Sequence, residues 1–182
     1  MRVLIIYATV EGHTAKIARF IGDEIEVAGH QVALSDVRQA GYAQPGEFDA
    51  VVVCGPIHMG HYPRELVRFA TDFHDALNSV PSALVTVSLS IASEHTDERE
   101  EAKSFPYVLC ESTGWAPLMR LDVAGALKYL EYNYFKRLAM RTIIKHAEGP
   151  AGEHVDTSKD HELTDWPALK TFVDRFLAHA FK

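Results

Sequence analysis

The sequence predicts a single α/β domain, residues 1–182, built on a parallel β-sheet with helices on both faces. Two apolar runs, Val3–Ala8 and Phe48–Cys54, consist largely of Val, Ile, Leu and Ala, which is typical of strands covered on both faces. Amphipathic helical patterns alternate with such runs along the chain, and this alternation favours β-α-β units. A length of 182 residues fits one domain.

Five segments have the pattern of strands. They are Val3–Ala8, Gln31–Val37, Phe48–Cys54, Ala83–Leu89 and Leu118–Gly125. The second alternates between apolar and polar residues, and the fifth is mixed in composition. Connections between parallel strands of one sheet are right-handed, so the intervening helices cover both faces of the sheet.

Four segments have helical periodicity. The first has its apolar stripe between Ile17 and Ala28 and ends at Gly29, and the second has its stripe from Leu66 to Leu77. The third spans Thr96–Thr113, with Thr96 as cap candidate and acidic residues in its first turn; Pro106 is expected to break or kink it. The last repeats from Leu169 to Ala180, with Thr164 or Asp165 as cap and Pro167 in its first turn.

Composition excludes some classes of function. The net charge of −7 disfavours non-specific binding to nucleic acid, which depends on Lys and Arg at phosphates. Cys54 and Cys110 do not make a disulfide framework, so a reducing cytoplasm is expected and no metal site is predicted. No apolar stretch reaches the roughly 18 residues of a spanning helix, so the protein is expected to be soluble, or at most to lie on a membrane surface.

A candidate phosphate loop joins the first strand to the first helix. Its residues are Thr9, Val10, Glu11, Gly12, His13 and Thr14. Backbone N–H groups at a helix N-terminus favour an anion, the Thr hydroxyls can donate to phosphate, and Gly12 permits a positive φ. The loop has no Lys or Arg, which favours a buried phosphate monoester over a nucleotide triphosphate with its P-loop lysine. The alternative is a capped turn that binds nothing.

Two further loops are expected at the same end of the sheet. After the third strand come Ile57, His58, Met59, Gly60, His61 and Tyr62, and after the fourth come Ser88, Leu89, Ser90, Ile91 and Ala92. Tyr62 is predicted to stack on a flat ring, Gly60 to let the backbone approach the ring edge, and the Ser-rich loop to offer backbone donors. The alternative for the first loop is a tight turn before the next helix, with Pro63 starting that helix.

The loop from Thr9 to Thr14, placed after an N-terminal strand, resembles the T/S-x-x-G-x-T loop by which flavodoxins hold the phosphate of FMN. The resemblance implies a flavodoxin-like sheet with strand order 2-1-3-4-5, and FMN bound beyond the carboxyl ends of the strands.

A narrower resemblance, nearly end to end, is to the menaquinone-dependent protoporphyrinogen IX dehydrogenases. Its carriers are Gly60-His61-Tyr62, residues 77–83, Gly114-Trp115-Ala116-Pro117, residues 124–129 and Thr164-Asp165-Trp166. It implies FMN-dependent oxidation of protoporphyrinogen IX, removal of six electrons, and a membrane quinone as acceptor. It also implies that Gly125, Ala126, Leu127 and Tyr129 border the flavin and shape the substrate side.

The same resemblance implies an insertion at residues 128–161, after the fifth strand, which ordinary flavodoxins lack. Between Lys128 and His146 there are five Lys or Arg residues and one acidic residue, and a helical wheel separates an apolar face from a basic one. Such a helix can contact the cytoplasmic face of the inner membrane or the propionates of the substrate. The alternative is an ordinary helix that packs on the domain. Residues 92–101, in contrast, are acidic and would repel both propionates and anionic lipid.

No catalytic acid or base is predicted, although His58, His61 and Tyr129 are candidates. Three other functions remain open: a flavodoxin that carries electrons between proteins, a quinone or nitro-compound reductase fed by NAD(P)H, and a flavin-free regulatory domain. The sequence predicts no oligomeric state.

Overall fold

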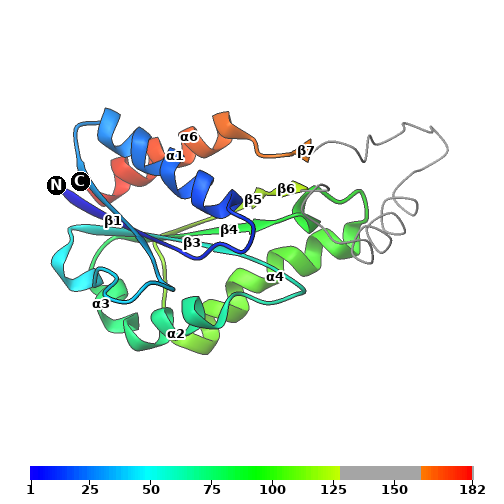
Figure 1. The fold of residues 1–182 in the computed structure, drawn as a ribbon, viewed down its shortest axis with the longest axis horizontal. Coiled ribbons are helices and arrows are strands. Elements are labelled where there is room, and N and C mark those ends of the chain that lie inside the picture. The colour runs from blue at the N-terminus through cyan, green and yellow to red at the C-terminus, as the bar shows by residue number, and fades with distance from the viewer. Residues whose placement is uncertain (128–160, 182) are drawn as a thin grey trace.

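The computed structural model describes residues 1–127 and 161–181 and contains a five-stranded parallel sheet between two helical layers (Figure 1). The strand order is β2-β1-β3-β4-β5, which confirms the predicted topology. The strands are β1 Arg2–Tyr7, β2 Gln31–Asp36, β3 Ala50–Pro56, β4 Ser82–Ser88 and β5 Met119–Ala124. Each predicted strand is present, with ends shifted by no more than two residues, which is the usual uncertainty of such boundaries.

Helices α1 and α6 cover one face of the sheet, and α2, α3 and α4 cover the other (Figure 1). The helices are α1 His13–Val27, α2 Arg64–Asp72, α3 His74–Ser79, α4 Thr96–Thr113 and α6 Trp166–Ala180, with single 3₁₀ turns η1 Pro45–Glu47 and η2 Ser90–Ala92.

The sheet buries both of its faces because successive strand side chains point to opposite sides. In β1, Val3 and Ile5 pack under α1 and α6, whereas Leu4 and Ile6 pack under the other layer; all four side chains are fully buried. Trp115 closes the second layer and donates its indole N–H to the Ser82 hydroxyl at 2.8 Å.

Two helical predictions need correction. The stripe from Leu66 to Leu77 belongs to two helices, because the chain breaks at Phe73, where φ is −116°. This break lets the Phe73 ring contact both Phe69 and Tyr42, with centroids 5.2 and 6.4 Å away. Pro106 does not end α4; it is buried inside a helix that continues to Thr113.

The helix ends agree with the sequence except at one cap. Gly29 follows α1 with a φ of 88°, and Asp165 caps α6 by accepting the Ala168 N–H at 2.9 Å. Thr96 is the first residue inside α4, and no side chain caps that helix. The acidic residues of its first turn, Asp97 and Glu98, instead interact favourably with the helix dipole.

A small antiparallel pair of strands was not predicted. Strand β6, Ala126–Leu127, pairs with β7, His161–Glu162, so His161, the last residue of the implied insertion, lies in a strand. The pair brings the chain back to the carboxyl end of β5, where Leu163 N–H donates to the Gly125 carbonyl at 3.2 Å. The predicted helix from Lys128 to His146, Tyr129 and the rest of the insertion to residue 160 lie outside the described residues. Within the described ranges, no helix is both long and apolar enough to span a bilayer.

Candidate functional site

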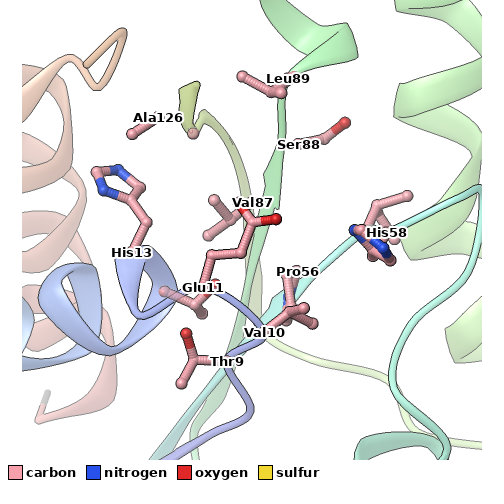
Figure 2. A pocket seen from close by; sticks show the side chains of 13 residues that line it. Thr9, Val10, Glu11, His13, Pro56, His58, Val87, Ser88, Leu89 and Ala126 are labelled. Atoms are coloured by element: carbon pink, nitrogen blue, oxygen red, sulfur yellow. The ribbon is translucent and has the colours of Figure 1, made fainter. Parts of the chain in front are cut away.

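A pocket opens at the carboxyl ends of β1, β3, β4 and β5, at the point where the strand order reverses (Figure 2). This is where ligands bind in open α/β sheets. Its lining residues are Thr9, Val10, Glu11, His13, Thr14, Pro56, Ile57, His58, Val87, Ser88, Leu89, Gly125 and Ala126.

Backbone hydrogen bonds tie the strand ends together beneath the pocket. Ala8 N–H donates to the Cys54 carbonyl at 3.1 Å, and Ile57 N–H donates to the Val87 carbonyl at 2.8 Å. These bonds continue the ladder of the sheet one residue beyond β1 and β3. The pocket floor is therefore part of the rigid sheet, and only its walls are loops.

The loop after β1 has the geometry of an anion site. Gly12 adopts a φ of 85°, as predicted, and donates its N–H to the Thr9 hydroxyl oxygen at 2.9 Å. The first hydrogen bond within α1 runs from Lys16 N–H to the Gly12 carbonyl at 3.1 Å. The amides of residues 13–15 therefore precede the bonding of the helix itself and point from its N-terminus. Because Thr9 accepts from Gly12, its hydroxyl proton can be donated to a ligand.

His13 and His58 lie on opposite sides of the pocket (Figure 2). The His13 ring is held from outside, because its Nε2 is 2.7 Å from the Thr164 hydroxyl oxygen. Trp166 lies beside it, with ring centroids 6.3 Å apart. The chain between β7 and α6 thus forms an outer support for the loop.

Glu11 is the acidic side chain among the pocket-lining residues. Figure 2 shows it extending from the loop into the pocket toward Val87. A carboxylate here opposes a bound anion, so the amides and hydroxyls of the loop have to outweigh it.

The loop after β3 contains a tight turn. His58 and His61 exchange backbone hydrogen bonds at 3.0 and 3.2 Å, and the two residues between them, Met59 and Gly60, have φ angles of 51° and 79°. Positive φ at both central residues matches a type I′ turn. Met59 is 85% exposed at its tip. Ile57 and His58 reach the pocket lining, whereas Met59, Gly60 and His61 do not.

Tyr62 is held against the sheet. Its hydroxyl is 2.7 Å from that of Thr86, and its ring packs against the α-carbon of Gly55. Burial raises the pKa of the phenol far above its usual value, although the Thr86 hydrogen bond opposes the shift. Tyr62 is absent from the pocket lining, and its stacking on a flat ring stays a prediction.

A carboxyl group lies near this tyrosine. Asp122 of β5 lies beside Thr86 of β4 in the register of the two strands. Its Oδ1 is buried without a hydrogen-bond partner among the described residues. Desolvation raises the pKa of Asp122, while Arg120, Lys103 and Thr86 act in the opposite direction. It lies two residues before the end of β5 and does not line the pocket.

The loop after β4 reaches the pocket lining with its first residues. Ser88 and Leu89 line the pocket, and the Ser88 hydroxyl accepts the Ser90 N–H at 3.2 Å. The three residues of η2, Ser90, Ile91 and Ala92, are not among the lining residues. The side chain of Leu127 lies outside the part of the chain that the structure describes. Two lining residues were missed, Pro56 and Val87. Both residues lie at the carboxyl ends of strands, Pro56 in β3 and Val87 in β4. The predicted third strand ends at Cys54, two residues before the observed end of β3 at Pro56.

The size of the pocket suits one end of a cofactor. The cavity volume is about 80 Å³, compared with roughly 300–1,000 Å³ for pockets that enclose a whole ligand. The enclosed part therefore fits a phosphate group beside the loop amides, and a flat ring would lie across the open mouth. The donor chemistry of residues 9–15 fits the phosphate of a flavin nucleotide.

Comparison with known proteins gives consistent results. The family profile described as "Flavodoxin domain" matches residues 4–153. A protoporphyrinogen IX dehydrogenase (quinone) of Escherichia coli (strain K12) is 30% identical over 98% of this chain and 96% of its own length. One of the same name from Leishmania major is 27% identical over 97% of this chain and 75% of that protein.

Solved structures agree on the fold. A Streptococcus pneumoniae TIGR4 flavodoxin aligns with a TM-score of 0.55 at 15% identity, covering 98% of this chain and 99% of that one. Oxidised flavodoxin 1 of Bacillus cereus gives 0.55 at 14% identity, with the same shares covered. Family membership implies a flavin cofactor. The chain belongs to the flavodoxin domain family.

Proposed function

We propose that this chain is an FMN-dependent oxidoreductase that oxidises protoporphyrinogen IX to protoporphyrin IX with a quinone as electron acceptor. The observation that carries the proposal is the match to dehydrogenases of that name over 98% of the chain. The match extends beyond residue 127, past the strands that every flavodoxin-like sheet shares, and includes the segment that supports the phosphate loop.

The choice of FMN as the flavin rests on the loop after β1. A phosphate monoester needs several donors in a small space, and the amides of residues 13–15 and the Thr9 hydroxyl supply them. Neither Lys nor Arg lies in the loop, so the loop lacks the cation that nucleotide triphosphate sites use. The small enclosed volume also favours a single phosphate.

The protein groups position the flavin and limit its contact with water. Thr9, Thr14 and the loop amides would hold the phosphate, and Ile57, His58 and Ser88 would border the ring. When bound, the flavin supplies the redox chemistry by accepting electrons from the substrate and passing them to the quinone. Six electrons and six protons leave each porphyrinogen, so three quinones are reduced per porphyrin. Contact of residues 128–146 with a membrane or with substrate is part of the proposal, supported by their basic charge.

A second candidate is an electron carrier of the flavodoxin type without a tetrapyrrole substrate. The feature that favours it is the acidic segment at and just before the start of α4, where Glu94, Asp97, Glu98, Glu100 and Glu101 are exposed. Helix α4 packs on η2, which follows the pocket-lining end of β4. Negative charge at this position would repel the propionates of a porphyrinogen and suits a basic protein partner.

Anaerobic turnover separates the two candidates. FMN-loaded protein is mixed with protoporphyrinogen IX and a water-soluble naphthoquinone, and porphyrin fluorescence is followed. A rate well above that of free FMN at the same concentration, and saturable in both substrates, is expected for the dehydrogenase. A rate equal to that of free FMN would refute it and would leave the carrier.

A charge-reversal variant tests whether the acidic segment at the start of α4 repels the propionates of the substrate. Glu98→Lys places a cation in the first turn of α4, and Glu111→Lys makes the same exchange near the other end of that helix. If porphyrinogen approaches past this segment, only Glu98→Lys should lower KM for it, at unchanged kcat. Equal KM values in both variants would show that the acidic segment does not face the substrate.

A further inference from the structure

Strand β5 lies at one edge of the sheet and pairs with β4 on one side only. Gly125 N–H donates to the Ser88 carbonyl at 3.4 Å. Alternate residues of a strand direct their backbone groups to the same neighbour, so Arg120 and Asp122 direct theirs to the outer edge. Among the described residues, no hydrogen bond outside the strand ladders involves these groups. Such an edge is a template for another strand.

The two edges of the sheet differ in charge. Strand β2, at the other edge, has one charged residue, Asp36, which is paired with Arg38 of its own chain. Strand β5 has Arg120 and Asp122, opposite in sign and two residues apart, both on the face that α4 covers. Charge on an edge commonly prevents pairing. A pair of opposite charges instead favours pairing with a strand that has the same two charges in reverse order.

A second copy of β5 is such a strand when it runs antiparallel. With a two-fold axis at Leu121, Arg120 lies opposite Asp122 of the partner subunit, and this pair occurs twice. An axis moved to Arg120 or to Asp122 places that residue opposite its own copy, where like charges repel. The charge pattern therefore selects one register. The partner's guanidinium also favours the ionised form of Asp122, whose burial raises its pKa.

Exposed apolar surface continues from this edge onto α4. Arg120 is exposed, and its guanidinium carbon lies 4.1 Å from the centroid of the Tyr107 ring, which places that ring beside β5. Tyr107 and the next residue, Val108, are 60% and 59% exposed, and Leu118, which precedes β5, is 50% exposed. Large apolar side chains with opposite charges among them are typical of a protein interface.

We propose that two copies of this chain pair through β5, antiparallel about a two-fold axis at Leu121, and form a homodimer with one continuous sheet. The contact uses the same surface on both subunits, so it closes at two copies. Because the two β5 strands run in opposite directions, the two pockets lie at opposite ends of the shared sheet. The proposal goes beyond the proposed function and does not depend on the substrate.

Cysteine cross-linking tests the register. Residues that face each other in an antiparallel pair without mutual hydrogen bonds have α-carbons about 4.5 Å apart, which a disulfide can bridge. Leu121 directs its backbone groups to β4 and takes this position opposite its own copy, so Leu121→Cys should form disulfide-linked dimers under mild oxidation. Met119→Cys is the matched control. Met119 packs on the same core layer as Leu121, but its copy lies roughly 13 Å away.

Sedimentation velocity of the FMN-loaded full chain measures the affinity. Between about 1 and 100 μM, the mass of the wild type should rise from one chain toward two. Arg120→Asp places two carboxylates opposite each other at both pairs and should raise the dissociation constant of the dimer at least about tenfold. Arg68→Asp makes the same change of charge at an exposed position of α2 and should have no effect.

Three outcomes overturn the proposal. A wild type that keeps the mass of one chain over the whole range has no such dimer. If Met119→Cys cross-links as fast as Leu121→Cys, the two copies do not meet in this register. If Arg120→Asp, folded as judged by circular dichroism, associates as tightly as the wild type, the contact does not involve the Arg120 and Asp122 pair. Wild-type protein, with Cys54 and Cys110 as its free thiols, gives the background of cross-linking.

Discussion

Gly55 gives a sharp test of how the site is built, because its missing side chain leaves room for Tyr62. Gly55 is a buried residue of β3. A β-carbon added there would lie 2.9 Å from Tyr62 Cδ1 and would clash still more severely with Leu66 Cδ2. Leu66 is fully buried in α2, so its side chain has little room to adjust, and the side chains of both Leu66 and Tyr62 would have to shift.

The expected cost of Gly55→Ala follows from three terms. Overpacking of a core costs about 1–3 kcal/mol, and loss of the hydrogen bond from Tyr62 to Thr86 costs about 1 kcal/mol more. The reduced freedom of the unfolded chain returns about 0.4–1 kcal/mol. We therefore expect a net loss of about 1–3.6 kcal/mol in the free energy of unfolding, together with weaker FMN binding as the loop from Ile57 to Tyr62 shifts.

Urea unfolding of Gly55→Ala and Gly46→Ala measures this difference. Gly46 lies in η1 on the surface, and a β-carbon there would meet nothing within 4 Å. The control should stay within about 0.5 kcal/mol of the wild type. If both variants are equally stable, the contact of Tyr62 with the sheet is not as described, and the loop is not held by it.

Three other changes have defined outcomes. The pKa of Asp122 is raised in the folded protein, so ionisation of this carboxyl group destabilises the fold, and stability should fall as the pH rises from the usual Asp range through the raised pKa. Urea titrations at pH 4 and pH 7 should show this loss for the wild type and not for Asp122→Asn. The same pH dependence in both proteins would refute the burial of this charge. Glu11→Gln should tighten FMN binding by about 1 kcal/mol, roughly fivefold, because it removes a negative charge from the pocket; unchanged affinity in a fluorescence titration would place the carboxylate outside the site. Burial raises the pKa of both thiols, that of Cys54 far more than that of half-buried Cys110. A thiol reagent at pH 8 should therefore modify the native protein slowly and only at Cys110, and labelling of Cys54 would contradict the core packing.

The sheet and the conformation of the loop after β1 could be predicted because their signals are local. Strand runs such as Val3–Ala8 are buried on both faces, so their composition alone identifies them. The positive φ at Gly12 is confirmed, since a glycine between a strand and a helix has a specific conformational use. Both features depend on a few consecutive residues.

Features that depend on distant contacts could not be predicted. The position of Tyr62 is determined by the notch at Gly55 and the hydroxyl of Thr86, and no local pattern relates these residues. Thr164 looked like a helix cap, yet its hydroxyl binds Ala124 and His13. The break at Phe73 interrupts a continuous helical pattern, and the Phe73 ring there packs on Tyr42, a tertiary contact that helical periodicity does not reveal.

The central claim is that the loop after β1 holds the phosphate of FMN, and two matched glycine substitutions test it most directly. Gly12 and Gly29 flank α1 with φ angles of 85° and 88°, and neither has an atom within 4 Å of an added β-carbon. They are roughly 25 Å apart along the helix, so strain is comparable while only Gly12 is near the site. Titration with FMN should show at least about tenfold weaker binding for Gly12→Glu, from repulsion of the phosphate, and wild-type affinity for Gly29→Glu. Equal FMN affinity in the two folded variants would contradict the claim.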